Sequence, residues 1–185
     1  MATVPRIAVV SCPSTIPFVH GVRCAADLGA ELLLSPDPAE IIRRFTDHDA
    51  DIALVPAVVV PSLADTRIVT GYCVGADEPA REAVETLDDP LVDLWRPYGV
   101  LPFAFAVWVA RKEVDALQLE ALEQALTFGL EHSYEALAAS GSVADPVAAY
   151  TSLIQLDYIY DTQKRQALDK FWDEGLKVAP RANPG

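Results

Sequence analysis

The chain has 185 residues, of which 51% are hydrophobic, so it is long enough to enclose one sizeable core. Asp and Glu outnumber Lys and Arg by 27 to 14, and the formal charge of −13 predicts repulsion from nucleic acids and anionic membranes. A small anionic ligand would therefore need a locally favourable pocket built from backbone amides or an arginine.

The cysteines and the apolar runs favour a cytoplasmic protein. Cys12, Cys24 and Cys73 make an odd number, which fits a reducing compartment better than a disulfide framework. The N-terminal residues lack the basic start and small-residue cleavage site of a signal peptide. The longest apolar run, 99–110, is too short to span a bilayer and contains Pro102. We expect no membrane partner and no nucleic-acid partner.

Short apolar runs predict five strands in the first 110 residues, mostly apolar on both faces as in a buried sheet. The runs are RIAVV at 6–10, ELLL at 31–34, DIALV at 51–55, RIVTGYCV at 67–74 and AFAVWVA at 104–110.

Helix signals alternate with these strands. Asp37 suits an N-cap and Pro38 the first helical position, which predicts a helix over 38–47. The alternation favours a doubly wound α/β layer, in which ligands gather at the carboxyl ends of the strands. The segment 77–98 is charged and broken by prolines, and we interpret it as a short helix and a connection across one end of the sheet.

The C-terminal part has helical periodicity. It predicts three helices, at 113–140, 146–158 and 162–177. We expect one α/β domain over 1–178, with a mostly parallel five-stranded sheet flanked by helices and a helical C-terminal part. A flexible tail over 179–185 should follow, because it is short and rich in proline.

Two loops at predicted strand ends are the candidate ligand site. The first strand is followed by SCPST, in which the side chains of Ser11, Cys12, Ser14 and Thr15 and free backbone amides could face a carboxylate or phosphate. Capping of the next helix by Ser14 or Thr15 explains the same residues equally well. The third strand is followed by Pro56-Ala57, which offers backbone amides and should lie beside the first loop.

Other reactive pairs are more typical of structural roles. Cys12 with His20 could form a nucleophile and a base, and His20 with Cys24 has the helical spacing that can bind a metal. Neither pair has a third supporting group in the sequence. No phosphate-binding glycine loop, dinucleotide fingerprint, GxSxG turn or paired cysteine motif occurs, so we predict no metal and no cofactor.

Several blocks, in order along nearly the whole chain, resemble one family. IAVVSCPSTIPFVHGV is similar to the opening of the menaquinone biosynthesis family of the futalosine pathway, which includes chorismate dehydratase. DADIALVPAVVV resembles its second signature and RIVTGYCVGADEP the strand that follows. LPFAFAVWVARKE is close to its most specific block, and LDYIYDTQKRQALDKFWDEG is similar to its C-terminal helix pair.

The resemblance implies a type II periplasmic-binding-protein-like fold with one lobe missing. In the family, a second α/β lobe is inserted between the strand that resembles RIVTGYCV and the LPFAFAVW block, and the ligand lies between the lobes. Here only about 78–100 fills that interval, which is too short for several strand–helix–strand units.

The site residues implied by the resemblance are only partly kept. The family's turn asparagine falls on Ser14, its loop serine on Ala57, and a further polar residue falls near Glu82. The residues that match are mainly framework residues: Thr15, Pro17, Phe18, Pro56, Pro102, Phe103 and Trp108. The resemblance thus implies Ser14 as the candidate catalytic residue. Together with the two strand-end loops, it gives an expected substrate site made of Ser11, Cys12, Ser14, Thr15, Pro56, Ala57 and Trp108.

Two functions follow as expectations. One is dehydration of chorismate to 3-[(1-carboxyvinyl)oxy]benzoate, an elimination driven by aromatisation and requiring no cofactor. The other is a non-catalytic single-lobe protein that binds a small carboxylate, or that forms a homodimer through the surface of the former cleft. Periplasmic solute binding is a third interpretation, which the missing leader disfavours.

Overall fold

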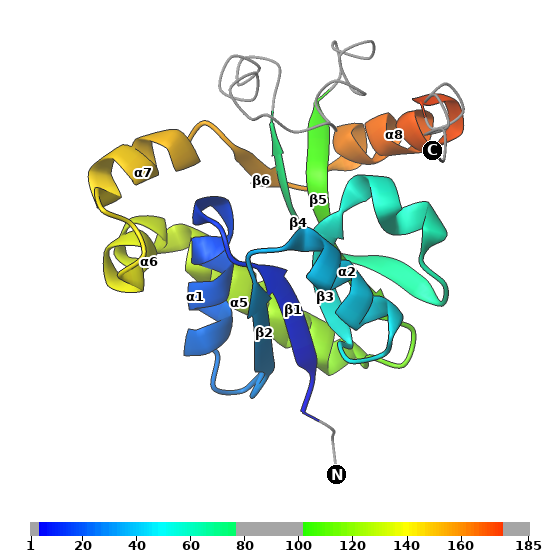
Figure 1. Ribbon diagram of the computed structural model, residues 1–185, viewed down its shortest axis with the longest axis horizontal. Coiled ribbons are helices and arrows are strands. Elements are labelled where there is room, and N and C mark those ends of the chain that lie inside the picture. The colour runs from blue at the N-terminus through cyan, green and yellow to red at the C-terminus, as the bar shows by residue number, and fades with distance from the viewer. Residues whose placement is uncertain (1–3, 77–101, 176–185) are drawn as a thin grey trace, which may run out of the picture.

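The computed structural model describes residues 4–76 and 102–175 (Figure 1). The predictions made for the connection 77–98, for the position near Glu82 and for the tail 179–185 fall outside these residues.

A six-stranded sheet forms the centre of the molecule, in the order β2-β1-β3-β5-β4-β6. Its strands are β1 (Arg6–Val10), β2 (Glu31–Ser35), β3 (Ile52–Pro56), β4 (Thr66–Ala76), β5 (Phe103–Arg111) and β6 (Asp157–Ile159). β1 pairs in parallel with β2 and β3, whereas β5 is antiparallel to β3 and β4, and β6 is antiparallel to β4. All five predicted strands are present at nearly the predicted positions.

The sheet differs from the prediction in direction and in number of strands. It is mixed rather than mostly parallel, because strands that are apolar on both faces look alike in either direction. The sixth strand, β6, lies where the second of the three predicted C-terminal helices was expected to end. The predicted helix 146–158 stops at Leu153, and the chain then pairs with β4 through Tyr72 and Gly75.

Helices cover both faces of the sheet (Figure 1). One face carries α1 (Ile16–Cys24), α5 (Ala116–Glu131), α6 (Ser133–Ser140) and α7 (Pro146–Leu153). The other carries α2 (Pro38–Thr46), the 3-10 helix η2 (Ala57–Ser62) and α8 (Thr162–Lys170), which continues as a π-helical turn, η5 (Phe171–Gly175). α2 begins as predicted, with the Asp37 carboxylate accepting from the Ala39 amide at 2.9 Å.

The long helix expected over 113–140 is divided at His132 into α5 and α6. The His132 backbone adopts a non-helical ψ of 33°, and its ring Nδ1 lies 2.9 Å from Phe128 O. α6 can therefore turn away from α5 and support α1 and α7.

Two glycines bring α1 and α5 into backbone contact. A Cβ atom on Gly21 would lie 1.9 Å from Ala125 O, and one on Gly129 would lie 2.0 Å from Pro17 O. Only residues without a side chain fit at these two positions. The contact holds α1 against the sheet and thereby fixes the place where the chain passes from β1 into α1.

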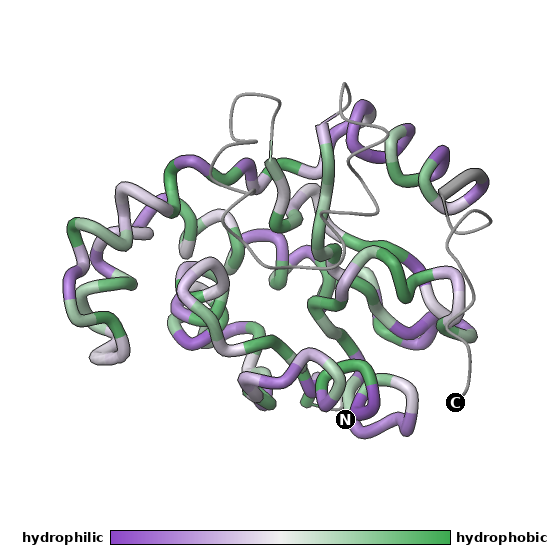
Figure 2. Tube along the Cα trace, turned by 45° about the horizontal axis from the view of Figure 1, so that its top comes forward, coloured by the Kyte–Doolittle hydropathy of each residue, from purple (hydrophilic) through white to green (hydrophobic). Residues whose placement is uncertain are grey.

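The buried residues form one layer on each face of the sheet. Figure 2 shows hydrophobic segments along the central strands and hydrophilic segments mainly on the peripheral helices. Trp108, Phe18, Phe45 and Phe171 are fully buried. In the described part of the chain, no helix combines the length and the apolar character needed to cross a bilayer.

Candidate functional site

The turn after β1 is held by the buried hydroxyl of Thr15. This hydroxyl lies 2.5 Å from Val10 O and 3.0 Å from Cys12 O, and it accepts from the Cys12 amide at 3.3 Å. The Thr15 amide donates to Cys12 O at 3.1 Å. Thr15 is 3% exposed, so its polar groups shape the turn. They are directed to the protein rather than to solvent.

The remaining polar side chains of the turn reach its surface. Ser11 is exposed, and Cys12 and Ser14 are half-buried. The Cys12 Sγ atom lies 3.1 Å from Ser14 Oγ, so the thiol and the hydroxyl form one small polar patch. The Ser11 amide donates to Ser35 O at 2.8 Å, which ties the turn to the end of β2. Hydroxyls and a thiol at a helix start suit an anion better than a cation.

The second loop lies beside this turn. β1 and β3 pair with Ile7 opposite Ile52 and Ala8 opposite Ala53. Continuing that register by three or four residues brings Ser11 level with Pro56 and the next residue level with Ala57, on strands about 4.8 Å apart. Ala57 is fully buried and begins η2. The structure therefore brings the two predicted loops together at the carboxyl edge of the parallel strands.

Trp108 lies below this edge rather than at it. It pairs with Leu54 across the sheet, two residues before Pro56, and it is fully buried. Its ring packs edge-to-face on Phe18 at 5.6 Å. Among the described residues, its indole N–H has no hydrogen-bond partner. The side chain supports the floor of the site through α1.

Two aromatic residues of the C-terminal part hold the two loops, and sequence reasoning did not assign them to the site. The Tyr158 hydroxyl donates to Ser14 O at 2.8 Å, and the Trp172 indole donates to Ala57 O at 2.9 Å. Both contacts join residues more than a hundred positions apart. The only signal in the sequence was a set of aromatic residues near the C-terminus, of which Tyr158, Tyr160 and Phe171 are buried.

Tyr158 is fixed in its neutral form. Burial raises the pKa of its hydroxyl, and the Cys12 and Cys73 thiols raise it further. Its ring packs edge-to-face on Phe18 at 5.3 Å. The hydroxyl therefore remains protonated at neutral pH and can donate a hydrogen bond to Ser14.

A buried ion pair lies nearby under the end of β4. The Lys164 side chain of α8 is fully buried and contacts the Asp157 carboxylate of β6. A Cβ atom on Gly75 would lie 3.1 Å from the Lys164 Cε atom, so the lysine fills the space beside a glycine. The pair joins β6, which carries Tyr158, to α8.

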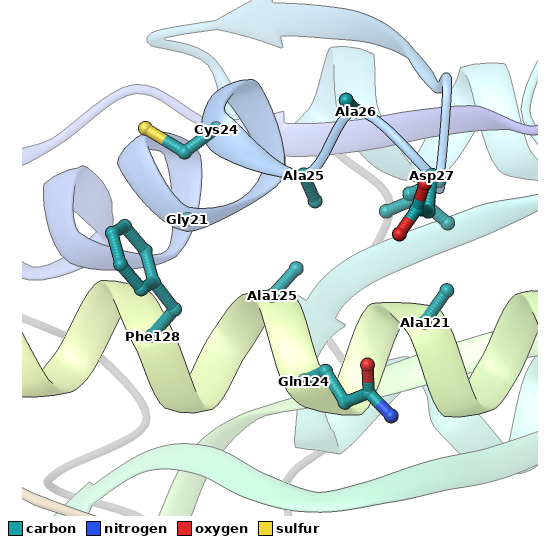
Figure 3. Close-up of a pocket in the computed structure, with 10 residues that line it drawn as sticks. Gly21, Cys24, Ala25, Ala26, Asp27, Ala121, Gln124, Ala125 and Phe128 are labelled. Carbon is teal, nitrogen blue, oxygen red and sulfur yellow. The ribbon is translucent and has the colours of Figure 1, made fainter.

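Two hollows lie away from the carboxyl edge. One, of about 330 Å³, lies between the end of α1 and α5, lined among others by Asp27, Gln124 and Phe128 (Figure 3). The other, of about 270 Å³, lies at the opposite edge of the sheet, beside Arg6 and Arg111. Within 4–76 and 102–175, no group of three or more His, Cys, Asp or Glu could hold a metal ion.

The sequence matches no protein-family model and no curated protein. Solved structures do resemble it. Protein AF1704 from Archaeoglobus fulgidus is 14% identical and has a TM-score of 0.65, with 91% of this chain and 95% of that chain covered. The Candida albicans CA3427 gene product, described as having the generic periplasmic binding protein fold, is 11% identical with a TM-score of 0.62, with 97% of this chain and 92% of that chain covered.

The periplasmic aliphatic sulphonate binding protein SsuA from Escherichia coli also aligns, at 8% identity and a TM-score of 0.55, with 95% of this chain and 89% of that chain covered. At such low identities the likeness concerns the fold alone. The chain has a periplasmic-binding-protein-like α/β fold, as predicted from its sequence.

Proposed function

We propose that the chain binds a small organic anion at the carboxyl edge of β1 and β3, and that the anion is a carboxylate of the chorismate class. The observation that carries the proposal is the adjacency of the Ser11–Thr15 turn and the Pro56-Ala57 loop. Open α/β sheets bind ligands outside the carboxyl ends of their strands. SsuA, which has a similar fold, binds aliphatic sulphonates, which are also small anions.

The contacts available to such an anion are neutral. Ser11 is exposed, and the Cys12 thiol and Ser14 hydroxyl lie 3.1 Å apart on the surface of the turn. These groups can donate hydrogen bonds to a carboxylate. Hydrogen bonds to a charged group stabilise it by about 1.5–3 kcal/mol each, so two or three of them offset much of the repulsion from the net charge of −13.

The finer form of the proposal is dehydration of chorismate. In this reaction a ring C–H bond and the ring C–O bond to the hydroxyl group break, water leaves and the ring becomes aromatic. Of the described residues, only Cys12 has a side-chain atom within hydrogen-bond distance of the Ser14 hydroxyl, and no carboxylate or imidazole forms a hydrogen bond with it. Catalysis would therefore rest on orienting the substrate for elimination, with Ser14 as its nearest polar contact.

The short interval between β4 and β5 favours a protein with a single lobe. Residues 77–102 separate β4 from β5, and this interval is shorter than the strand–helix–strand units from which an α/β lobe is built. A single-lobed site contacts its ligand on one side only, which favours weak affinity. A second protein surface on the other side of the ligand would raise the affinity.

The test is a titration of the purified protein with chorismate by calorimetry, with the ultraviolet spectrum and the products followed by mass spectrometry. Binding with formation of the carboxyvinyloxybenzoate supports the dehydratase, and binding without turnover supports a carboxylate-binding protein. Absence of heat, of product and of any change in melting temperature at millimolar chorismate would overturn both.

Ser14→Ala should weaken chorismate binding by roughly tenfold, which corresponds to the loss of one hydrogen bond. The exposed Ser142→Ala, on the loop before α7, should not.

A second candidate function is self-association. Val147, Tyr150 and Ile154 are 60%, 37% and 54% exposed and share one side of α7 and its C-terminal end. Tyr134 of α6, 45% exposed, packs edge-to-face on Tyr150 at 5.8 Å and extends this apolar surface. Light scattering would show a dimer if the surface is covered by a second copy. Val147→Glu should then return the protein to a monomer, and a monomeric wild-type protein would reject this function.

A further inference from the structure

One pair of metal-binding side chains lies outside the site described above. His20 and Cys24 are one helical turn apart on α1, and their Nε2 and Sγ atoms are 3.7 Å apart. A tetrahedral zinc ion forms bonds of about 2.1 Å to imidazole nitrogen and about 2.3 Å to thiolate sulfur, which places two such ligand atoms about 3.6 Å from one another. The pair therefore already has the separation that one ion requires.

The surroundings of the pair also favour a cation. Phe128 of α5 lies nearly parallel to the His20 ring, with an interplanar angle of 13° and ring centroids 6.1 Å apart. Figure 3 shows Cys24 on the last turn of α1 with its sulfur directed away from α5, and Phe128 reaching from α5 toward α1. Cys24 is exposed. The C-terminal end of a helix carries partial negative charge, and the acidic protein as a whole attracts divalent cations.

We propose that His20 Nε2 and Cys24 Sγ bind a divalent cation of the zinc class. Binding breaks the S–H bond of Cys24, forms a bond from sulfur to the metal and releases the proton to solvent. In the described part of the chain no third His, Cys, Asp or Glu joins the pair, so the remaining coordination positions face water. The site is thus open and exchangeable, and a bound ion links the last two turns of α1.

The test uses Co²⁺ as the probe, because a cobalt–thiolate bond produces an ultraviolet charge-transfer band. The reduced, full-length protein should develop this band on titration, and Zn²⁺ should abolish it by displacement. His20→Ala and Cys24→Ser should each lose the band. His132→Ala is the matched control, since His132 also stacks on Phe128, with ring centroids 4.1 Å apart, but is not a proposed ligand, so the band should be unchanged.

A stability measurement gives an independent readout. Zn²⁺ should raise the melting temperature of the wild-type protein and not that of Cys24→Ser, because a ligand that binds only the folded state stabilises it. No band in the wild-type protein would overturn the proposal. A band that survives both substitutions, or that depends on Cys12 instead of Cys24, would overturn it as well. These results do not depend on whether chorismate binds.

Discussion

The two edges of the sheet are built differently. At the carboxyl edge of β1 and β3, the loop contacts are made by neutral groups: the Thr15 and Tyr158 hydroxyls, the Trp172 indole and backbone carbonyls. At the opposite edge the contacts are charged. Arg6 binds Asp51 through two of its nitrogens, at 2.9 and 3.1 Å, and donates to His48 O at 2.7 Å.

Arg111 is the central residue of the charged edge. It is 7% exposed, and its guanidinium donates to the carbonyls of Phe45 and Thr46, the last residues of α2. The same guanidinium lies 4.3 Å above the Phe45 ring. A cation at the C-terminal end of a helix is favourable, so Arg111 of β5 caps α2 and holds it on the sheet.

The two edges therefore have different roles: one stabilises the fold and the other is proposed to bind the ligand. Charges at one edge fix the framework, and neutral donors at the other edge leave room for the charge of a ligand. Lys164 does lie near the carboxyl edge, but it is buried against Asp157, so this carboxylate compensates its charge. Substitutions at the charged edge should therefore change stability without changing ligand binding, and substitutions at the neutral edge should change both.

Arg111→Met should produce the largest loss of stability. The substitution keeps an unbranched apolar stem but removes the guanidinium, which leaves two carbonyls at the end of α2 without their cationic donor, at a cost of about 2–3 kcal/mol. Urea unfolding at pH 7 measures this loss. The neighbouring Lys112→Met is the matched control, because Lys112 and its partner Asp65 are 63% and 70% exposed, so their solvent-screened ion pair should contribute little to stability.

Ligand affinity tests the comparison itself. If the edges are independent, Arg111→Met should bind chorismate as the wild-type protein does at a temperature where both are folded. A loss of affinity that exceeds the unfolded fraction would show that the charged edge influences the site, and the separation of the two edges would then be wrong.

The sequence predicted this framework where the signals are local. Strands β1, β3 and β5 follow from continuous apolar runs, and α2 from Asp37 and Pro38 at its start. The direction of β5 could not be predicted, because its residues are apolar on both faces whichever way the strand runs. β6 has only three residues, and its partner is β4, far away in the sequence. The sequence pattern of the predicted helix 146–158 therefore concealed this strand.

The site was predictable only in its loops. Ser11–Thr15 and Pro56-Ala57 follow predicted strands, and strand ends meet at one edge of a parallel pair. The residues that fix these loops could not be predicted, since Tyr158 contacts a residue 144 positions away and Trp172 one 115 positions away. Similarly, nothing in the local sequence distinguishes Arg111 from the exposed Lys112 beside it.

Tyr158→Phe should have a smaller effect on stability and a clear effect on binding. It removes the hydrogen bond to Ser14 O and keeps the aromatic packing on Phe18, at a cost of about 1 kcal/mol. The turn that carries Ser14 should become more mobile. The free energy of chorismate binding should therefore fall by more than the free energy of unfolding does. Calorimetry and urea unfolding measure the two effects. The exposed Tyr134→Phe, on α6, should change neither, and unchanged affinity in Tyr158→Phe would mean that the tyrosine does not position the turn.

The smallest expected effect is the pH dependence contributed by Asp51. Burial alone would raise the pKa of this carboxyl, but the hydrogen bonds and the charge of Arg6 outweigh burial and lower it. A carboxyl whose pKa is lower in the folded state stabilises the fold above its unfolded pKa of about 3.9, and this contribution disappears as the pH falls through the folded pKa. Both partners are about one-third exposed, so solvent screening limits the contribution to about 0.5–1 kcal/mol.

Asp51→Asn should therefore be less stable than the wild-type protein at pH 7, and the two should converge as the pH falls below about 4. Glu40, whose pKa is lowered to about 2 by its hydrogen bonds to Arg43 and Arg44, also contributes stability that decreases as the pH falls toward 2. Because both proteins contain Glu40, its effect cancels in the difference between their unfolding free energies, measured in urea at pH 7, 5 and 3. A difference that stays constant over these three pH values would show that the Asp51 carboxylate stabilises this edge through its shape and not through its charge. One of the charged contacts that distinguish this edge from the carboxyl edge would then be removed.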